Sequence, residues 1–316
     1  MKKLAITISA ILASGAAYAG NEATTELQFA YGDDVQITQN TSHANPALGN
    51  DAFVYMTNTY KNDTVILQTG NENTATVDAN QASRSDFDIT QTGSQNAATI
   101  QTTTAINYRN DLDIVQQGNN NTSTVYVNDG DYNDADVKVK GDGNTTVATF
   151  NGEGADSNHI KTTIVNGDNN TVTSVVNNGN GNDAHAAVRN SDQNIINTTQ
   201  NGDNSDTYVS VRGGSDLNEI DVTQNDSNYA SVSVYWGSDG NDIDISQNDN
   251  NDAEVNVGMY SDLNEISIDQ TSNGSDALVN LAFSSNNAIS VWQNANDSAM
   301  VTGYASDHNT VNIVQN

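Results

Sequence analysis

A heptapeptide with two alternating isoleucines recurs along this chain. The pattern Asn-x-Ile-x-Ile-x-Gln occurs at residues 241–247 (NDIDISQ) and again at residues 264–270 (NEISIDQ). Looser copies, each with an Asn six positions before a Gln, lie at residues 62–68, 110–116, 194–200, 218–224, 287–293 and 309–315. From Gln200 to Gln315 these glutamines are separated by 24, 23, 23, 23 and 22 residues. A fixed period of this size is typical of a chain built from stacked repeats, so it constrains the fold more than any other feature.

The repeat weakens at two places. Between Gln39 and Gln68 an insertion around residues 43–50 holds the only proline. Between Gln116 and Gln200 the pattern is blurred: Lys140 and Val165 stand roughly where a Gln is expected, and residues 177–189 look like an insertion or an extra half-repeat. We predict a single repeat domain over residues 20–316, with about eleven repeats and irregular stretches around residues 40–60 and 130–193.

Apolar residues alternate with polar ones within each repeat. Ile243 and Ile245 precede Gln247 at every second position, which is the period of a strand with one buried face. A run rich in Asn and Asp follows, as expected for a turn, and a second alternating segment then covers residues 251–257. One repeat is therefore predicted to be strand, turn, strand, turn, and it is too thin to bury a face alone.

Stacking such repeats predicts an all-β fold, a β-solenoid of strand–turn–strand repeats with cross-β spacing. Copies of each Ile, Val and Gln would lie about 4.8 Å apart. Buried Gln and Asn side chains can then hydrogen-bond to their own copies, which satisfies polar groups that are otherwise costly inside a protein. A globular β-sandwich is the alternative, but it does not need the same polar residue in every repeat. The residues predicted to form these stacking ladders are Gln39, Gln68, Gln91, Gln116, Gln200, Gln224, Gln247, Gln270, Gln293, Gln315, Asn62, Asn110, Asn194, Asn218, Asn241, Asn264, Asn287 and Asn309.

Acidic residues occupy the alternating positions that should face outward. In a stack they form columns of like charge, and two unit charges at this spacing repel by about 0.9 kcal/mol in water before screening. Two interpretations stay open: a solvated face that keeps the strands soluble, or a pH- or cation-dependent control of assembly. The residues concerned are the pairs Asp86 and Asp88, Asp111 and Asp113, Glu219 and Asp221, and Asp242 and Asp244.

Composition narrows the class of protein. Residues 1–19 have the basic end, short apolar stretch and small-residue cleavage site of a secretory signal peptide, and no later segment is apolar enough to span a bilayer. A formal net charge of −30 argues against binding to nucleic acid or to anionic lipid. The low content of large aliphatic residues is compatible with disorder. The alternation in nearly every repeat argues against that, although the chain can stay unfolded until it assembles.

The repeats resemble the curlin repeats of curli fibre subunits, whose pattern is Ser/Asn-x5-Gln-x-Gly-x2-Asn-x-Ala. Residues 85–98 carry the full pattern, with Ser85, Gln91, Gly93, Asn96 and Ala98. Residues 62–75 carry it with Asn in place of Ser, and residues 110–123 carry it with a final Ser in place of Ala. The later repeats depart from it, because Asp226, Asp249, Ser272 and Ala295 replace the glycine.

The resemblance implies a structural role. It implies secretion through an outer-membrane apparatus as an unfolded chain, a nucleator subunit as a partner, and assembly into amyloid fibres of a biofilm matrix at the bacterial surface. It leaves open whether this chain is a major subunit or a nucleator. A monomeric acidic β-solenoid acting as an adhesin or ice-binding module is the alternative, although an ice-binding face would need Thr-x-Thr in successive repeats.

Residues that carry catalysis or bind cofactors are not indicated, so we predict no enzyme, no metal site and no cofactor. The chain has no cysteine, and its four histidines, His43, His159, His185 and His308, do not recur in register with the glutamines and are expected to be surface residues. Residues 129–140 open like a calcium loop but have Asp134 where glycine is needed and Lys140 where an acid is needed.

The two ends of the repeat domain look complementary. Residues 26–29 (ELQF) align with residues 254–257, which are a second strand, whereas residues 309–315 are a first strand with no second strand after them. Unpaired strand edges invite pairing with another chain. We therefore expect a head-to-tail homopolymer in which the last half-repeat of one molecule meets the first half-repeat of the next.

Overall fold

The computed structural model describes residues 20–41, 48–103, 107–152, 154–294 and 296–316. The predicted signal peptide and most of the predicted insertion at residues 43–50 lie outside the described residues. Within the described residues there is no helix long and apolar enough to cross a membrane. The chain divides into two compact units, residues 1–158 and 159–316, and each is described by itself.

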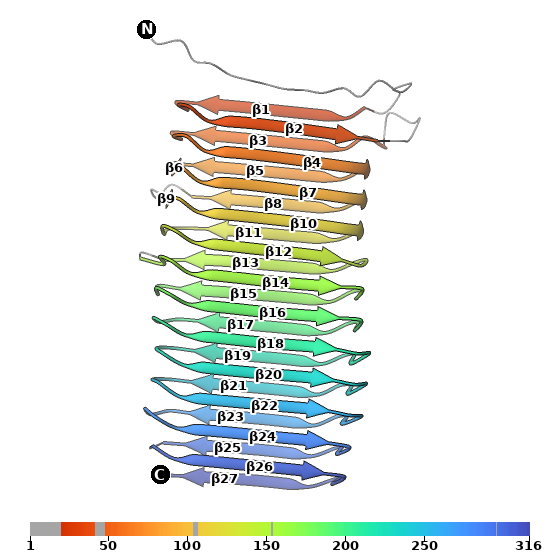
Figure 1. Cartoon of the computed structure of the whole chain (residues 1–316), viewed down its shortest axis with the longest axis vertical. Coiled ribbons are helices and arrows are strands. Elements are labelled where there is room, and N and C mark those ends of the chain that lie inside the picture. Colours follow the sequence, from red (N-terminus) through yellow and green to blue (C-terminus); the bar gives the residue numbers. More distant parts are fainter. Residues whose placement is uncertain (1–19, 42–47, 104–106, 153, 295) are drawn as a thin grey trace. The chain divides into compact units, whose positions relative to one another are not determined.

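The first unit contains two parallel sheets. One has the strand order β1-β3-β5-β8-β11-β13, the other the order β2-β4-β7-β10-β12, and the short strands β6 and β9 form a separate pair. Successive strands along the chain alternate between the two sheets (Figure 1). The bounds are β1 (Glu22–Gln28), β2 (Asp34–Asn40), β3 (Asp51–Thr57), β4 (Asp63–Asn71), β5 (Thr74–Asn80), β6 (Ala82–Ser83), β7 (Asp86–Ser94), β8 (Ala97–Thr102), β9 (Asn107–Tyr108), β10 (Asp111–Asn119), β11 (Thr122–Val127), β12 (Asp134–Lys140) and β13 (Thr145–Asn151).

The second unit repeats this arrangement. One sheet has the order β15-β17-β19-β21-β23-β25-β27 and the other the order β14-β16-β18-β20-β22-β24-β26, again with parallel pairing. The bounds are β14 (His159–Val165), β15 (Thr171–Asn177), β16 (Asp183–Arg189), β17 (Ile195–Gln200), β18 (Asp206–Arg212), β19 (Glu219–Gln224), β20 (Tyr229–Tyr235), β21 (Asp242–Gln247), β22 (Asp252–Gly258), β23 (Glu265–Gln270), β24 (Asp276–Ala282), β25 (Ala288–Gln293), β26 (Ser298–Tyr304) and β27 (Thr310–Gln315). Each unit is a β-solenoid, so the predicted fold class is confirmed.

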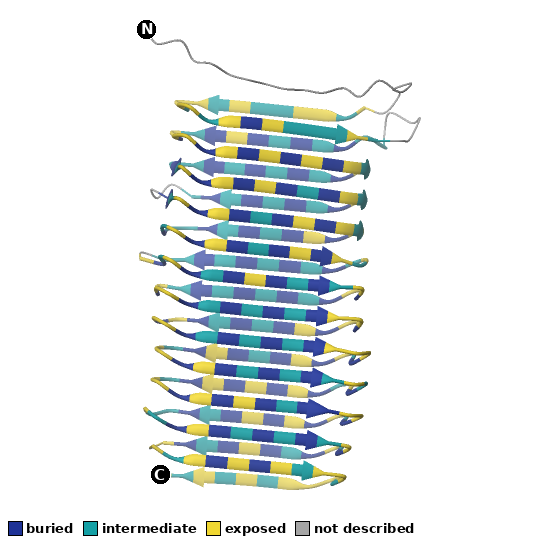
Figure 2. Ribbon diagram, in the orientation of Figure 1, coloured by how far each residue is buried: buried dark blue, intermediate teal, exposed yellow. Residues whose placement is uncertain are grey.

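The core of each unit lies between its two sheets. Burial alternates along every interior strand, as Figure 2 shows, and on β21 the buried side chains are Ile243, Ile245 and Gln247. Neighbouring strands pair without a shift, so Ile243 lies opposite Ile266 and Gln247 opposite Gln270. Stacking like on like therefore fills each core with columns of aliphatic side chains, and the glutamines form a column of amides beside them.

The blurred middle of the sequence is regular in the structure. β16 is a strand of ordinary length that pairs with β14 and β18, so residues 183–189 form an additional half-repeat and not a loop insertion. The expectation that Lys140 takes a Gln position is wrong by one residue. Val139 lies opposite Gln116, whereas Lys140 lies opposite Gln117 and is exposed. Valine can replace glutamine in this buried column because the position requires an inward-facing side chain. Lys140 faces outward and does not belong to the column.

The turn that follows the glutamine differs between the two units. In the first unit β4, β7 and β10 continue three residues past the Gln, and Gly70, Gly93 and Gly118 lie in register with φ of 122–129°. A Cβ atom on Gly93 would lie 1.9 Å from the carbonyl oxygen of Gly118. The glycine is therefore required by close backbone contact as well as by its dihedral angle. In the second unit the strands end at the Gln, and the requirement disappears.

Candidate functional site: polar ladders, surface clusters and open ends

The predicted glutamines form two hydrogen-bonded ladders, one in each unit. In the first, the Nε2 of each glutamine donates to the Oε1 of the next at 2.9 Å, from Gln39 through Gln68 and Gln91 to Gln116. In the second, the same contact runs from Gln200 to Gln315 at 2.9–3.3 Å. The interior members are fully buried. Each ladder thus has a direction, with donors facing one end and acceptors the other.

Each interior amide also binds the backbone of its own turn. Gln247 Nε2 donates to the carbonyl oxygens of Tyr229 and Asn251 at 3.1 and 3.0 Å, in addition to Gln270 Oε1 at 2.9 Å. Its own Oε1 accepts from Gln224 Nε2 at 3.0 Å. The Gln side chain therefore holds together two strands of one turn and the turns on either side.

The asparagines six positions earlier form a second kind of ladder. Asn264 uses both its backbone N–H and its Nδ2 to donate to Asn241 Oδ1, at 3.1 and 2.9 Å. The same paired contact joins the other predicted asparagines of the second unit, Asn194, Asn218, Asn287 and Asn309. In the first unit Asn62 and Asn110 are linked through Ser85, whose N–H donates to Asn62 Oδ1 and whose Oγ accepts from Asn110 N–H. Each contact fixes the start of a strand against the previous turn.

The ladders stop where valine replaces glutamine, and a hydroxyl side chain compensates at the end of the first ladder only. Gln116 lies opposite Val139, and its Nε2 donates instead to Ser123 Oγ at 2.9 Å. Ser123 is the residue that replaces the expected alanine of the repeat. Gln200 lies opposite Val176 at the start of its ladder, and its buried Oε1 accepts no hydrogen bond from the described residues.

Sequence reasoning missed a further set of buried ladders. The asparagines that follow the Gln by five residues, Asn73 and Asn96, are fully buried and bond to each other as the predicted ones do. Serine forms a comparable column in the second unit, where Ser238 N–H donates to Ser215 Oγ at 3.2 Å. The signal for the first set was present, because the same asparagine recurs in every well-formed repeat of the first unit.

The acidic residues form columns on the outside of each unit. In the first unit Asp63, Asp86, Asp111 and Asp134 lie in register on four neighbouring strands, and Asp88, Asp113 and Asp136 form a second column beside them. Partial burial, together with the charges of Asp111, Asp88, Asp136 and Asp134, raises the pKa of Asp113 to about 6. The pKa values of Asp86, Asp88 and Asp111 are raised for the same reasons.

The second unit has a shorter acidic group. Asp221 and Asp244 lie in register, beside the column of Glu219, Asp242 and Glu265. Burial and these four neighbouring charges raise the pKa of Asp244, with burial the largest cause. Columns of like charge therefore disfavour the ionised, folded state in both units.

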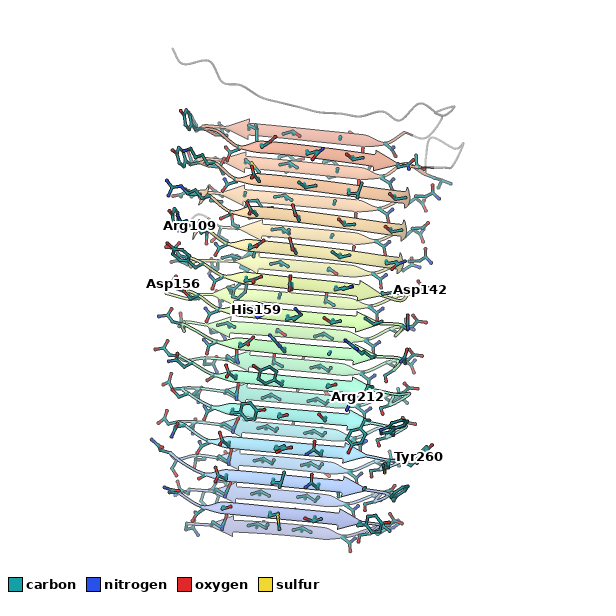
Figure 3. All side chains as sticks on the ribbon, in the orientation of Figure 1. Arg109, Asp142, Asp156, His159, Arg212 and Tyr260 are labelled. Carbon is teal, nitrogen blue, oxygen red and sulfur yellow. The ribbon has the colours of Figure 1, made fainter. Side chains whose placement is uncertain are left out.

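Two of the histidines that were expected to be surface residues lie together. His159 on β14 and His185 on β16 are both within hydrogen-bond distance of Asp183 Oδ1, at 3.1 and 2.7 Å, and the facing ring nitrogens are 3.2 Å apart. His159 is labelled in Figure 3, on the strand β14. Burial lowers the pKa of His185, partly opposed by Asp183. His308 is exposed in the turn before β27 and lies apart from this cluster.

The terminal strands leave inward positions uncovered. Val311, Ile313 and Gln315 on β27 are half-buried, whereas the residues opposite them on β25 are buried. On β1 and β2 the inward residues Leu27, Ile37 and Gln39 are likewise half-buried. Each of these ends therefore presents an incomplete layer of core.

The sequence alignment of β1 is wrong by two residues. Gln39 Nε2 donates to the carbonyl oxygen of Glu22, and Gln270 Nε2 makes the same contact with Asp252. Glu22 therefore takes the place of Asp252 in the repeat, and Leu27 takes the place of Val257 and not of Val255. Strand alternation is preserved by a shift of two residues, so the alternation alone could not detect the error.

Comparison with known families identifies the repeat. The curlin associated repeat matches residues 61–93 and 109–138 of this chain. No curated protein sequence matches this chain. The matched residues include β4, β10 and most of β7 and β12. Gln68, Gln91 and Gln116 of the first ladder, and the glycine column, lie on β4, β7 and β10. The resemblance noted in the sequence is confirmed over residues 61–93 and 109–138, which match curlin repeats.

Proposed function

We propose that this protein is a structural subunit of an extracellular curli-like amyloid fibre, and that the fibre grows by end-to-end addition of chains. The curlin repeats and the solenoid fold point to a structural protein. The observation that supports growth in this direction is the match between the two exposed end layers.

The end strands match residue for residue. Laying β2 of one copy beside β27 of another brings Val35 opposite Val311, Ile37 opposite Ile313 and Gln39 opposite Gln315. These are the same pairings that the interior strands make, for example Ile289 opposite Val311. The junction would therefore continue the core with aliphatic side chains over aliphatic side chains.

The hydrogen-bond polarity of the ladders also matches. Along each ladder Nε2 donates to the next Oε1 toward the C-terminal end, and Gln315 Nε2, which donates to Ser298 O, has a second N–H for a following amide. At the other end Gln39 donates to Gln68, and no described residue donates to Gln39 Oε1. Joining Gln315 of one copy to Gln39 of the next would connect two ladders without leaving an unmatched buried amide.

The second junction, between β26 and β1, fits by shape. Gly303 occupies an inward position of β26, and a hollow of about 290 Å³ opens there beside Leu281 and Val301. The carbonyl oxygens of Glu22 and Ser298 each accept a hydrogen bond from the glutamine of the next strand, so Glu22 would lie opposite Ser298 across the junction. Leu27 would then lie opposite Gly303. Leu27 of the incoming copy would fill this hollow, so β1 supplies the volume that β26 lacks.

Such a contact repeats in one direction and does not close, so it gives a filament and not a ring. We infer a cell-surface biofilm fibre, a nucleator subunit and an outer-membrane secretion apparatus from the curlin repeats. The chain that begins at residue 20, purified unfolded and then transferred to buffer, should form dye-binding fibres with a meridional spacing of about 4.8 Å. A chain that folds and stays monomeric at high concentration would contradict the proposal and favour a monomeric binding module.

A further inference from the structure

We infer that His159, Asp183 and His185 form a binding site for one divalent transition-metal ion, such as Zn²⁺, on the outer face of the second unit. The site goes beyond the proposed fibre role and does not depend on it. It reverses the expectation from the sequence that the chain has no metal site.

The three candidate ligand atoms form a small triangle. His159 Nδ1 lies 3.1 Å from Asp183 Oδ1, His185 Nε2 lies 2.7 Å from the same oxygen, and the two nitrogens are 3.2 Å apart. Atoms that occupy neighbouring positions around a metal at about 2.1 Å are separated by roughly 3 Å. The triangle therefore has the size of one face of a metal coordination sphere, with the remaining positions open to water.

Without a metal, hydrogen bonds among these three side chains satisfy their polar atoms less well. Either two N–H groups converge on one oxygen and face each other, or one ring turns a nitrogen lone pair toward the carboxylate oxygen. With a divalent cation, each neutral ring carries its proton on the other nitrogen, and all three lone pairs point to the ion. Two imidazoles with one carboxylate favour zinc, copper, nickel or iron over calcium or magnesium.

The surroundings hold the carboxylate and add charge. Tyr208 on β18 donates from its hydroxyl to Asp183 Oδ2 at 3.3 Å, which leaves Oδ1 for the ion. Asp206 lies opposite Asp183 and supplies a second negative charge, whereas Lys161 lies opposite His185 and supplies a positive one. The rings of His159, His185 and Tyr208 pack edge to face in one row, with centroids 5.0 and 5.1 Å apart, so the ligands are held by packing on three neighbouring strands.

Equilibrium dialysis against Zn²⁺ tests the site, in physiological salt with excess Mg²⁺ to occupy the acidic columns. We expect one Zn²⁺ per chain. His159→Ala and His185→Ala should each weaken binding by more than about 100-fold, and Tyr208→Phe, which removes only the support of Asp183, by about tenfold. The matched control His308→Ala removes an exposed histidine from the same unit and should leave the affinity unchanged.

A second measurement keeps the inference testable if a variant misfolds. With one equivalent of Cu²⁺ bound to the unchanged chain, electron paramagnetic resonance should show coupling to two imidazole nitrogens. Absence of stoichiometric Zn²⁺ binding, or equal binding by the His185→Ala and His308→Ala variants, would overturn the inference. A copper spectrum without nitrogen coupling would do the same, and would leave the three residues as a hydrogen-bonded cluster.

Discussion

Replacing one buried glutamine tests how much the amide ladder contributes to the fold. Gln247→Ala removes two N–H donors, which are shared among Tyr229 O, Asn251 O and Gln270 Oε1, and one hydrogen bond accepted from Gln224. A net value of about 1 kcal/mol for each of these three hydrogen atoms in a hydrogen bond gives a loss of about 3 kcal/mol. The cost falls on the neighbouring turns, because the partners left behind are buried amides and backbone carbonyls.

Hydrogen exchange measures this loss locally, which suits a repeat protein whose turns can open separately. In Gln247→Ala, amides of β19, β21 and β23 should exchange roughly 10²-fold faster, since about 1.4 kcal/mol corresponds to a factor of ten. Ser246→Ala is the matched control, because Ser246 is the adjacent, outward-facing residue of the same strand. It should change the exchange free energy by less than about 0.5 kcal/mol. Equal effects of the two substitutions would refute a stabilising amide ladder.

Three further outcomes follow from the acidic columns, the glycine column and the open C-terminal end. The pKa of Asp113 is raised to about 6 in the folded chain, so folding takes up a proton. Stability is therefore highest below the ordinary carboxyl pKa and is lost as pH rises through about 6. Asp113→Asn should flatten the dependence of the denaturation midpoint on pH between about pH 4 and pH 7. Gly93→Ala should prevent the first unit from folding natively, as judged by exchange protection, whereas Gly154→Ala meets no atom within 4 Å and should cost only about 1 kcal/mol for its positive φ. Deleting residues 309–316 should stop fibre elongation from preformed seeds while exchange protection of the interior strands is retained, and elongation at the unchanged rate would exclude β27 as a growing end.

The sequence was sufficient to predict the repeat and the side chains that face inward. Alternation places Ile243 and Ile245 in the core, and only an inward, stacked Gln247 explains why an amide recurs beside them. The curlin pattern in residues 62–98 also contained Asn73 and Asn96, but periodicity does not say that an asparagine in a turn is buried. Burial there comes from the previous turn, which covers the side chain and accepts its hydrogen bonds.

The sequence was insufficient where one residue of register decides the outcome. Lys140 and Val139 are adjacent, and only strand pairing shows which of them faces inward. His159 and His185 are 26 residues apart, which hides that His159 lies opposite Asp183, one period of 24 residues away. Counting the local period from β14 to β16 would have placed His185 two residues beyond Asp183, on the same face of the sheet.

End-to-end growth requires that the last strand of one chain pairs with the start of the next in an ordinary strand register, and disulfide trapping tests this pairing directly. The chain lacks cysteine, so single cysteines can be introduced cleanly. Thr38 and Val314 face outward on β2 and β27 and would be opposite each other across the junction, at a distance that a disulfide can span. Fibres grown from a mixture of Thr38→Cys and Val314→Cys chains should give a disulfide-linked heterodimer on oxidation, and a mixture of Thr38→Cys with Thr310→Cys, four residues out of register, should not. Equal yields from the two mixtures, or no crosslink in mature fibres, would contradict end-to-end growth.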